Sequence, residues 1–241
     1  MNTDLIPVDL FGSSHALESN FFHAALHFLW ALPKYQTARR RYIFLDQAID
    51  AQGGRAITNS LVLRIIRNIT ARAAANPQGH LTILILGSNN IRIYQQHPDH
   101  VILFFRTIIM HAEATPHSHV LLVGLVPDAG ADAHTREGFR KLNTLFAGLA
   151  SEFPQSCTFA PVAKLFTHFR VVRDEFFQRM DGNDARTRRK RRERDDRIAR
   201  GRQRPPLRPE LDCHLNFEGQ KLFVGKILQV MGSGISRQRF T

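Results

Sequence analysis

The sequence predicts an α/β fold: a three-layer α/β/α sandwich around a five-stranded parallel sheet. Short apolar runs of strand length alternate along the chain with longer segments whose apolar residues recur every three or four positions, as in amphipathic helices. Such alternation favours right-handed βαβ crossovers, which place helices on both faces of a parallel sheet. No internal repeat interrupts the pattern, so we expect residues 1–241 to form a single domain.

Each expected strand is a short run, rich in apolar residues, that a glycine, a proline or a turn ends. Gly12 ends the first run and Pro127 the fourth. The third run, Leu81–Leu86, is mostly apolar, which is typical of a strand buried on both faces. In chain order, the strands are expected at residues 5–11, 41–45, 81–86, 120–126 and 157–162.

Each expected helix carries an apolar stripe that is suited to face the sheet. Pro33 ends the first helix, whereas Pro77 and Gly79 close the second. Thr58 is placed to cap the second helix, because its hydroxyl can accept a hydrogen bond from the first turn. In chain order, the helices are expected at residues 16–32, 58–75, 97–112, 135–153 and 217–231.

One segment does not fit the alternation of strands and helices. Residues 171–180 have some helical character, but the sequence that follows is dense in charge and has no apolar stripe. The chain has a net charge of +12, and the window Arg186–Arg208 contains twelve Lys and Arg against three acids. We therefore expect residues 183–209 to form an exposed, basic and flexible insertion, and the rest of the domain to be only mildly basic.

The composition excludes several classes of protein. Hydrophobic residues make up 43% of the chain, enough for a core and too many for a disordered protein. Cys157 and Cys213 cannot staple 241 residues and favour a reducing compartment. The N-terminus does not resemble a secretion signal, and no apolar run has the length of a membrane span. We expect a cytoplasmic protein, with the nucleus as the alternative because of the basic segment.

Three polar segments stand where a parallel sheet gathers its functional loops. Ser14 follows the first strand, where a small-residue turn can expose its hydroxyl and bring its N–H to a helix N-terminus. Asn89 follows the third strand, where its amide can donate to an oxyanion. His214 precedes the last helix and can reach Ser14 across that edge. The ordinary alternatives are helix caps for Ser14 and Asn89, and a surface histidine for His214.

Taken together, these segments resemble the sequence blocks of the SGNH (GDSL-type) hydrolases. Phe11–Ser14 is similar to the family's Phe-Gly-Asp-Ser, and Gly54 (or Gly53) matches its glycine after the second strand. Gly87–Asn90 is close to Gly-x-Asn-Asp, and His214–Gly219 matches His-Leu-Asn-x-x-Gly. The blocks occur in the family's order on the expected elements, and the resemblance implies a flavodoxin-like sheet.

The resemblance implies acyl transfer from an ester, with no metal and no organic cofactor. Ser14 takes the position of the nucleophile, and His214 takes the position of the base that accepts its proton. The resemblance also implies an oxyanion hole formed by the backbone N–H groups of Ser14 and Gly54 and by the side chain of Asn89. The substrate class is therefore a small-molecule carboxylic ester, such as an acyl or acetyl ester.

The chain departs from the family pattern at three positions. The family's acid lies three residues before its histidine, where this chain has Leu211, and Asp212 is the candidate acid in its place. Ser13 and Asn90 replace the aspartates of the first and third blocks. Cys213, beside the candidate base, is either an inert buried thiol or a catalytic one.

The basic segment supports a hypothesis of a different class: a weakly active or inactive SGNH-like domain that binds RNA or DNA. Arginine suits phosphate contacts, and residues 186–204 contain no aromatic side chain for base stacking, so binding is expected to be salt-sensitive and independent of base sequence. A solvated insertion without a partner is the third reading. The candidate contacts are Arg188, Arg189, Lys190, Arg191 and Arg192.

A metal site is not expected. His117 and His119 form an H-x-H pair before the fourth strand, but the sequence offers no third ligand at a recognisable spacing.

Overall fold

The computed structural model of the chain describes residues 5–16, 21–128, 131–168, 171–179, 185–201, 211–233 and 235. Within these ranges, side chains are described except at residues 45–48, 168, 171–172, 174, 179, 185–187, 190 and 211–213. None of the described helices combines the length and the apolar character that crossing a membrane requires.

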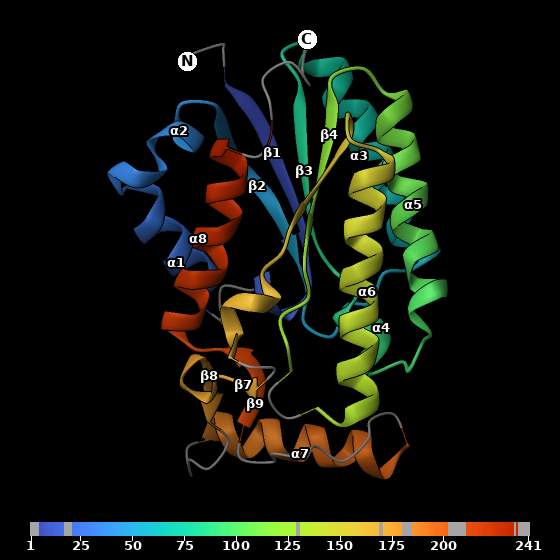
Figure 1. Ribbon diagram of the computed structural model, residues 1–241, viewed down its shortest axis with the longest axis vertical. Coiled ribbons are helices and arrows are strands. Elements are labelled where there is room, and N and C mark those ends of the chain that lie inside the picture. Colours follow the sequence, from blue (N-terminus) through green and yellow to red (C-terminus); the bar gives the residue numbers. More distant parts are fainter. Residues whose placement is uncertain are drawn as a thin grey trace.

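A five-stranded parallel sheet forms the centre of the molecule, as the sequence predicts (Figure 1). Its strand order is β2-β1-β3-β4-β5, and every neighbouring pair is parallel. The first strand therefore lies between the second and the third, and the carboxyl ends of all five meet at one edge. The strands are β1 (Ile6–Gly12), β2 (Tyr42–Ala51), β3 (His80–Ile85), β4 (Ser118–Val123) and β5 (Cys157–Ala160).

Helices cover both faces of this sheet, which confirms the three-layer sandwich (Figure 1). On one face, α1 (Phe22–Trp30), α2 (Gln36–Arg39) and α8 (Phe217–Ser233) pack together. On the other face lie α3 (Asn59–Ala75), α4 (Ser88–Arg92), α5 (Pro98–Ala114) and α6 (Ala133–Glu152). Alternate side chains of each strand enter opposite layers, because successive side chains of a strand point to opposite faces. In β3, for example, Ile83 joins the first apolar cluster and Leu84 the second.

Two predicted element boundaries are wrong at the start of the chain. The first helix begins at Phe22 rather than at residue 16, because Phe21 has a left-handed φ of 66° that interrupts the helix, and Ser14–Ala16 forms a short 3-10 turn. The second strand continues to Ala51, well beyond residue 45, since its pairing with β1 resumes after an irregularity and extends to Gly12. Thr58 caps α3 as predicted, and its hydroxyl accepts a hydrogen bond from the Leu61 N–H (3.4 Å).

The segment before the last helix differs most from the prediction. Residues 171–179 do not form an α-helix; they form β7 (Val171–Val172), a 3-10 turn and β8 (Phe177–Arg179). The basic segment, where no element is expected, contains the helix α7 (Ala185–Ala199). Arginine has a high helix propensity, and i,i+4 ion pairs such as Arg189–Glu193 (3.5 Å) support the helix without an apolar stripe. Flexibility of residues 183–209 stays a prediction.

A small two-stranded sheet, β8-β9, returns the chain to the carboxyl edge of the main sheet. β9 (Leu211–Leu215) pairs antiparallel with β8, with Leu215 opposite Phe177. Both of these side chains are buried in the apolar cluster beneath α8. The pairing of β9 with β8 therefore fixes where the segment ahead of α8 lies, which is the segment that contains His214.

Candidate active site

The turn that follows β1 is held tightly against the end of β3. The Ser13 N–H donates to the Ile85 carbonyl (2.9 Å), and the Ala16 N–H donates to the Ser13 carbonyl (3.0 Å). A Cβ at Gly12 would lie 2.4 Å from the Cβ of Ala16, so this turn closes only around a glycine. Ser14 thus begins a 3-10 turn directly at the tip of the strand.

Ser14 and Asn89 line the same small cavity. The ends of β1 and β3 are neighbours in the sheet, so the turns that follow them come together, as the sequence analysis expects. The cavity has a volume of about 10 Å³, room for about one water molecule. Its walls include Ser14, Asn89, Arg92, Val126, Asp128 and Phe139.

The loop that contains Gly54 is joined to Asn89. Gly54 has a φ of 72°, in the left-handed region that favours glycine. The next residue, Arg55, accepts a hydrogen bond from Asn89 Nδ2 through its backbone carbonyl (2.9 Å). A side-chain amide has two N–H groups, so Asn89 keeps a second donor after this bond is made. Gly54 and Asn89 thus lie on adjoining segments, but Gly54 lines a separate pocket and not the cavity at Ser14, so its role as an oxyanion donor stays a prediction.

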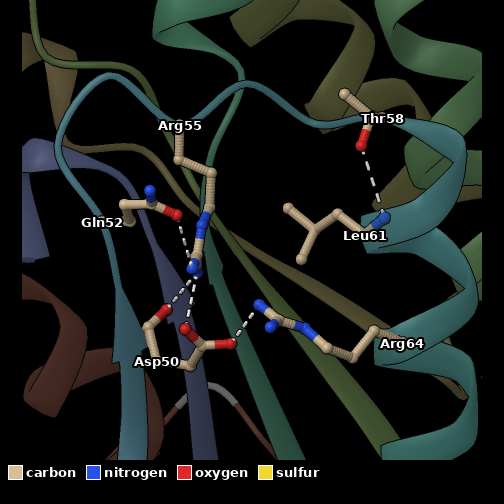
Figure 2. A network of polar contacts seen from close by, with 6 residues as sticks. All are labelled: Asp50, Gln52, Arg55, Thr58, Leu61 and Arg64. Atoms are coloured by element: carbon tan, nitrogen blue, oxygen red, sulfur yellow. Dashed lines mark hydrogen bonds and ion pairs between the residues drawn. The ribbon is translucent and has the colours of Figure 1, made fainter.

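The side chain of Arg55 fixes the other end of the same loop (Figure 2). Its Nη1 donates to the carbonyl and to Oδ1 of Asp50, at 2.8 Å each, and its Nη2 donates to Oε1 of Gln52 (3.2 Å). Arg64, on α3, binds the second carboxylate oxygen of Asp50. The Arg55 side chain is 12% exposed, whereas that of Arg64 is 54% exposed. Sequence reasoning missed this network, whose only local signal is an acid and a base on either side of a Gly-Gly turn.

Asn90, which stands where the family has an aspartate, fastens the same loop to α4. It is fully buried, its Oδ1 accepts from the Ile57 N–H (2.9 Å), and its Nδ2 donates to the Ile57 carbonyl (2.9 Å) and to Gln96 Oε1 (2.8 Å). A carboxylate has no N–H and cannot make the last two bonds. The asparagine is therefore suited to this environment.

The segment that contains His214 lies against the Ser14 turn. β9 contacts the 3-10 turn Ser14–Ala16, and the rings of His214 and His15 have centroids 5.8 Å apart. The buried side chain of Gln220, on α8, donates to the His15 carbonyl (3.0 Å). Two segments about 200 residues apart in the sequence therefore meet at one edge of the sheet.

Asn216 and Gly219, which follow His214 in the same block, have structural roles at the start of α8. Asn216 Oδ1 accepts from the Gly219 N–H (2.9 Å), an N-terminal cap of α8, and Asn216 Nδ2 donates to the Glu175 carbonyl (2.6 Å). A Cβ at Gly219 would lie 2.4 Å from the Phe176 carbonyl oxygen. The asparagine and the glycine thus hold α8 against the turn before β8 and fix the loop beside them.

The candidate acid lies outside the described side chains. Asp212 belongs to β9, but its side chain, like those of Leu211 and Cys213, is outside the part of the structure that is described. Its role as the partner of His214 stays a prediction.

A buried ion pair forms part of the cavity wall. Arg92 Nη1, from α4, lies 3.4 Å from Asp128 Oδ2, and the two side chains are 13% and 5% exposed. Sequence reasoning missed the pair because the two residues are 36 positions apart and belong to no recognised motif.

Both ring nitrogens of His119, the second residue of the H-x-H pair, contact residues at or just before the start of β5. His119 Nδ1 and Nε2 lie within hydrogen-bond distance of the Gln155 carbonyl (3.0 Å) and of Thr158 Oγ1 (2.9 Å). Over the described ranges, no three His, Cys, Asp or Glu side chains gather as a metal site.

The basic helix α7 crosses the end of the molecule where the strands terminate (Figure 1). Arg188, Arg189 and Arg192 are exposed on it, whereas Arg191 is half-buried. The side chain of Lys190 is outside the described part. Just after the end of α7 in the chain, the Gly201 carbonyl accepts from Gln95 Nε2 (3.5 Å), which links α7 to the α4–α5 loop.

No known family description and no curated protein matches the sequence. Solved structures are similar at low identity. A protein assigned as an acylhydrolase from Bacteroides fragilis is 14% identical, with a TM-score of 0.55 over 95% of this chain and 88% of that one. A carbohydrate esterase of family 3 from Talaromyces cellulolyticus is also 14% identical, with a TM-score of 0.55 over 96% of this chain and all of that one.

A third structure, a variant of an acetyl esterase with an acetate ion, is 13% identical and has a TM-score of 0.54 over 94% of this chain and 98% of that one. Each likeness extends over nearly the whole of both chains, and it agrees with the strand order and the helical layers described above. The chain has the fold of the SGNH (GDSL-type) hydrolases.

Proposed function

We propose that this protein hydrolyses carboxylic esters through an acyl-enzyme formed on Ser14. One observation carries the proposal: Ser14 and Asn89 line one cavity, and the strand that contains His214 lies against the Ser14 turn. The residues that we propose as nucleophile, base and oxyanion donor therefore lie on segments that meet at the same edge of the sheet. The fold, which this chain shares with esterases and acylhydrolases, agrees with that chemistry.

The proposed reaction has two halves. Ser14 Oγ attacks the ester carbonyl while His214 takes the hydroxyl proton, and the C–O bond to the alcohol breaks as His214 returns that proton to the leaving alkoxide. Water then attacks the acyl-enzyme with His214 as base, which releases the carboxylic acid and restores Ser14. Asp212, if its carboxylate meets the second ring nitrogen of His214, stabilises the imidazolium.

The oxyanion of each tetrahedral intermediate is held by fixed donors. These are the backbone N–H groups of Ser14 and Gly54 and the remaining N–H of Asn89 Nδ2. Each donor contributes about 3 kcal/mol of transition-state stabilisation, so Asn89→Ala lowers kcat by about 100-fold or more.

The test compares two neighbouring serines. Wild-type protein is expected to hydrolyse p-nitrophenyl acetate, and Ser14→Ala abolishes this activity because the nucleophile is lost. Ser13→Ala is the matched control: the Ser13 hydroxyl has no hydrogen-bond partner in the described part of the structure, and its backbone N–H makes the structural bond. Ser13→Ala therefore keeps the wild-type rate within about twofold. Equal rates for the wild type and Ser14→Ala would remove Ser14 from the mechanism.

Nucleic-acid binding by residues 186–204 is the second candidate function. The exposed side of α7 supports it with Arg188, Arg189 and Arg192, but Glu193 and Asp196 lie on the same exposed surface and reduce its charge. Replacing these three arginines with glutamine is expected to remove binding to a generic single-stranded RNA at low salt, together with its salt dependence. RNA binding that is unchanged in this variant would refute the role of α7.

A further inference from the structure

A groove with a volume of about 890 Å³ runs along α8, in the helical layer that also contains α1 and α2 (Figure 1). The residues of α8 that line it recur at helical spacing from Glu218 to Ser233, so the groove follows one side of this helix. That stretch is about 22 Å long, or about four turns. The described residues that line the groove differ from those that line the cavity at Ser14.

The groove has an apolar floor that is open to solvent. Leu29, on α1, and Leu228, on α8, are 4% and 1% exposed and lie at its base. Phe28 and Leu222 also line the groove, but they are 52% and 38% exposed and therefore stand at its open side. Exposed apolar side chains that gather around a recess are typical of a protein-binding surface, unlike single apolar residues scattered over a surface.

The rim of the groove carries positive charge. Four of the lining side chains are cations, and only Glu218 is an acid. Glu218 is paired with Lys221 (2.7 Å), and Arg173 is paired with Glu175 (2.7 Å). The four cations are Lys34, Arg173, Lys221 and Lys226.

Two of these cations have no carboxylate beside them in the part of the chain that the structure describes. Lys34 lies over the ring of Tyr35 (5.0 Å), and Lys226 donates to Gln229 Oε1 (3.2 Å). Both contacts leave the ammonium charge uncompensated. An occupant that brings carboxylates to the rim therefore gains an attraction that a neutral occupant does not.

We infer that this groove docks an acidic amphipathic helix of a partner protein. Such a helix presents apolar residues every three or four positions along one face, and a helix of about 15 residues matches the length of the groove. Its apolar face fits against Leu29 and Leu228, while acidic residues that flank this face meet Lys34 and Lys226. The docking does not depend on the proposed ester hydrolysis.

The charge and the shape of the groove argue against other occupants. A second copy docked by two-fold symmetry would bring the same cations of both protomers face to face, which is unfavourable. The C-terminal segment 236–241 contains two arginines and no acid, so it does not complement the rim. A flat lipid surface would reach Phe28 and Leu222 but not the recessed Leu29 and Leu228.

The test measures the binding of a labelled peptide to the whole chain by fluorescence anisotropy. The peptide has about 18 residues, or about five turns, with leucines on one helical face and glutamates elsewhere. One control peptide has the same composition in scrambled order, and another has lysine in place of every glutamate. We expect the acidic amphipathic peptide to bind at least about tenfold more tightly than either control.

Charge reversal separates docking in the groove from a general attraction to a basic protein. Lys34→Glu/Lys226→Glu weakens binding of the acidic peptide by about tenfold or more, because repulsion replaces attraction at the rim. Arg67→Glu/Lys141→Glu is the matched control. These side chains reach solvent from α3 and α6, on the opposite face of the sheet, and the variant keeps the affinity within about threefold.

The apolar contribution is tested in the same way. Phe28→Ser/Leu222→Ser weakens binding by about tenfold or more, and Leu222→Ser alone gives a smaller loss that keeps the inference testable if the double variant does not fold. The matched control is Leu103→Ser/Met110→Ser on α5, where the two side chains are 55% and 54% exposed and line no part of the groove. It binds the peptide like the wild type.

Three results would overturn the inference. Equal affinities for the acidic peptide and its scrambled form would show that charge alone suffices. An affinity that is unchanged in both groove variants would place the peptide elsewhere on the protein. Binding to phosphatidylserine vesicles that depends on Phe28 and Leu222, without binding of the acidic peptide, would make the occupant a lipid surface instead of a helix.

Discussion

Arg55 joins the loop of Gly54 to Asn89 and to the end of β2. Its guanidinium binds Asp50 at the end of β2, and its carbonyl accepts the Asn89 amide, while Gly54 immediately precedes it in the chain. The positions of the Gly54 N–H and of the Asn89 amide are thus linked through Arg55, which follows Gly54 in the chain and binds Asn89. Preorganised donors stabilise an oxyanion only where their geometry is held.

Arg55→Met is therefore expected to lower kcat for ester hydrolysis by about tenfold or more and to leave KM nearly unchanged, because the loop loses its anchor while the ground-state contacts remain. Arg64→Met is the matched control. It removes the exposed partner of the same Asp50 without reaching the loop, and it keeps kcat within about twofold. Equal losses in the two variants, with a KM that rises as much as kcat falls, would contradict a positioning role for Arg55.

At the residue scale, the sequence identified some members of the candidate site and missed the contacts that hold others in place. Ser14, Gly54, Asn89 and His214 could be proposed because each stands at a fixed place in a motif. Asn90 was identified as a departure from the family pattern, but its three hydrogen bonds to Ile57 and Gln96 depend on how loops fold, which no local spacing encodes.

At the scale of elements, β1, β3 and α3 are joined by a buried ionic contact. Asp9, in the middle of β1, accepts from Arg72 Nε (2.7 Å) and Nη2 (3.1 Å), and its Oδ2 lies 2.9 Å from His80 Nε2. Burial alone would raise the pKa of Asp9, but the hydrogen bonds from His80 and Arg72 outweigh it and hold the pKa below its ordinary value. The carboxylate form is therefore stabilised by folding.

The sign of the pH dependence follows from this lowered pKa. The stabilisation is fully present above the pKa of an unfolded aspartate, about 3.9, and is lost as the pH falls through the lower pKa of the folded state. Asp9→Asn removes the charge, so it lowers the free energy of unfolding by about 3 kcal/mol near pH 6, and the difference from the wild type shrinks below about pH 4. Urea unfolding from pH 2 to 6 measures this, and a variant as stable as the wild type at pH 6 would contradict it.

The central elements were predictable because apolar spacing alone determines them. All five strands of the sheet and helices such as α3 and α6 lie where the sequence places them, with shifts of a few residues at most boundaries. The start of α1 was not predictable, because the left-handed Phe21 interrupts a continuous apolar stripe. The helix α7 was missed for the opposite reason: it has no apolar stripe at all, and helix propensity and ion pairs support it instead.

At the scale of the whole molecule, the candidate site combines segments from residue 14 to residue 214. The parallel sheet explains part of this, because it brings the turns after β1, β2 and β3 to one edge. The antiparallel pair β8–β9 explains the rest, since it carries His214 to the Ser14 turn. The sequence could predict the first convergence because the carboxyl ends of parallel strands share one edge. It could not predict the pair β8–β9, whose strands are too short to show a period of two.

The central claim is that Ser14 is a nucleophile activated by His214, and covalent labelling tests it most directly. A fluorophosphonate that reacts with activated serines is incubated with the wild type and with His214→Gln, and the modified peptide is identified by mass spectrometry. We predict one adduct on Ser14 in the wild type and a rate at least about 100-fold lower in His214→Gln. No adduct on Ser14, or equal rates in the two proteins, would contradict the account.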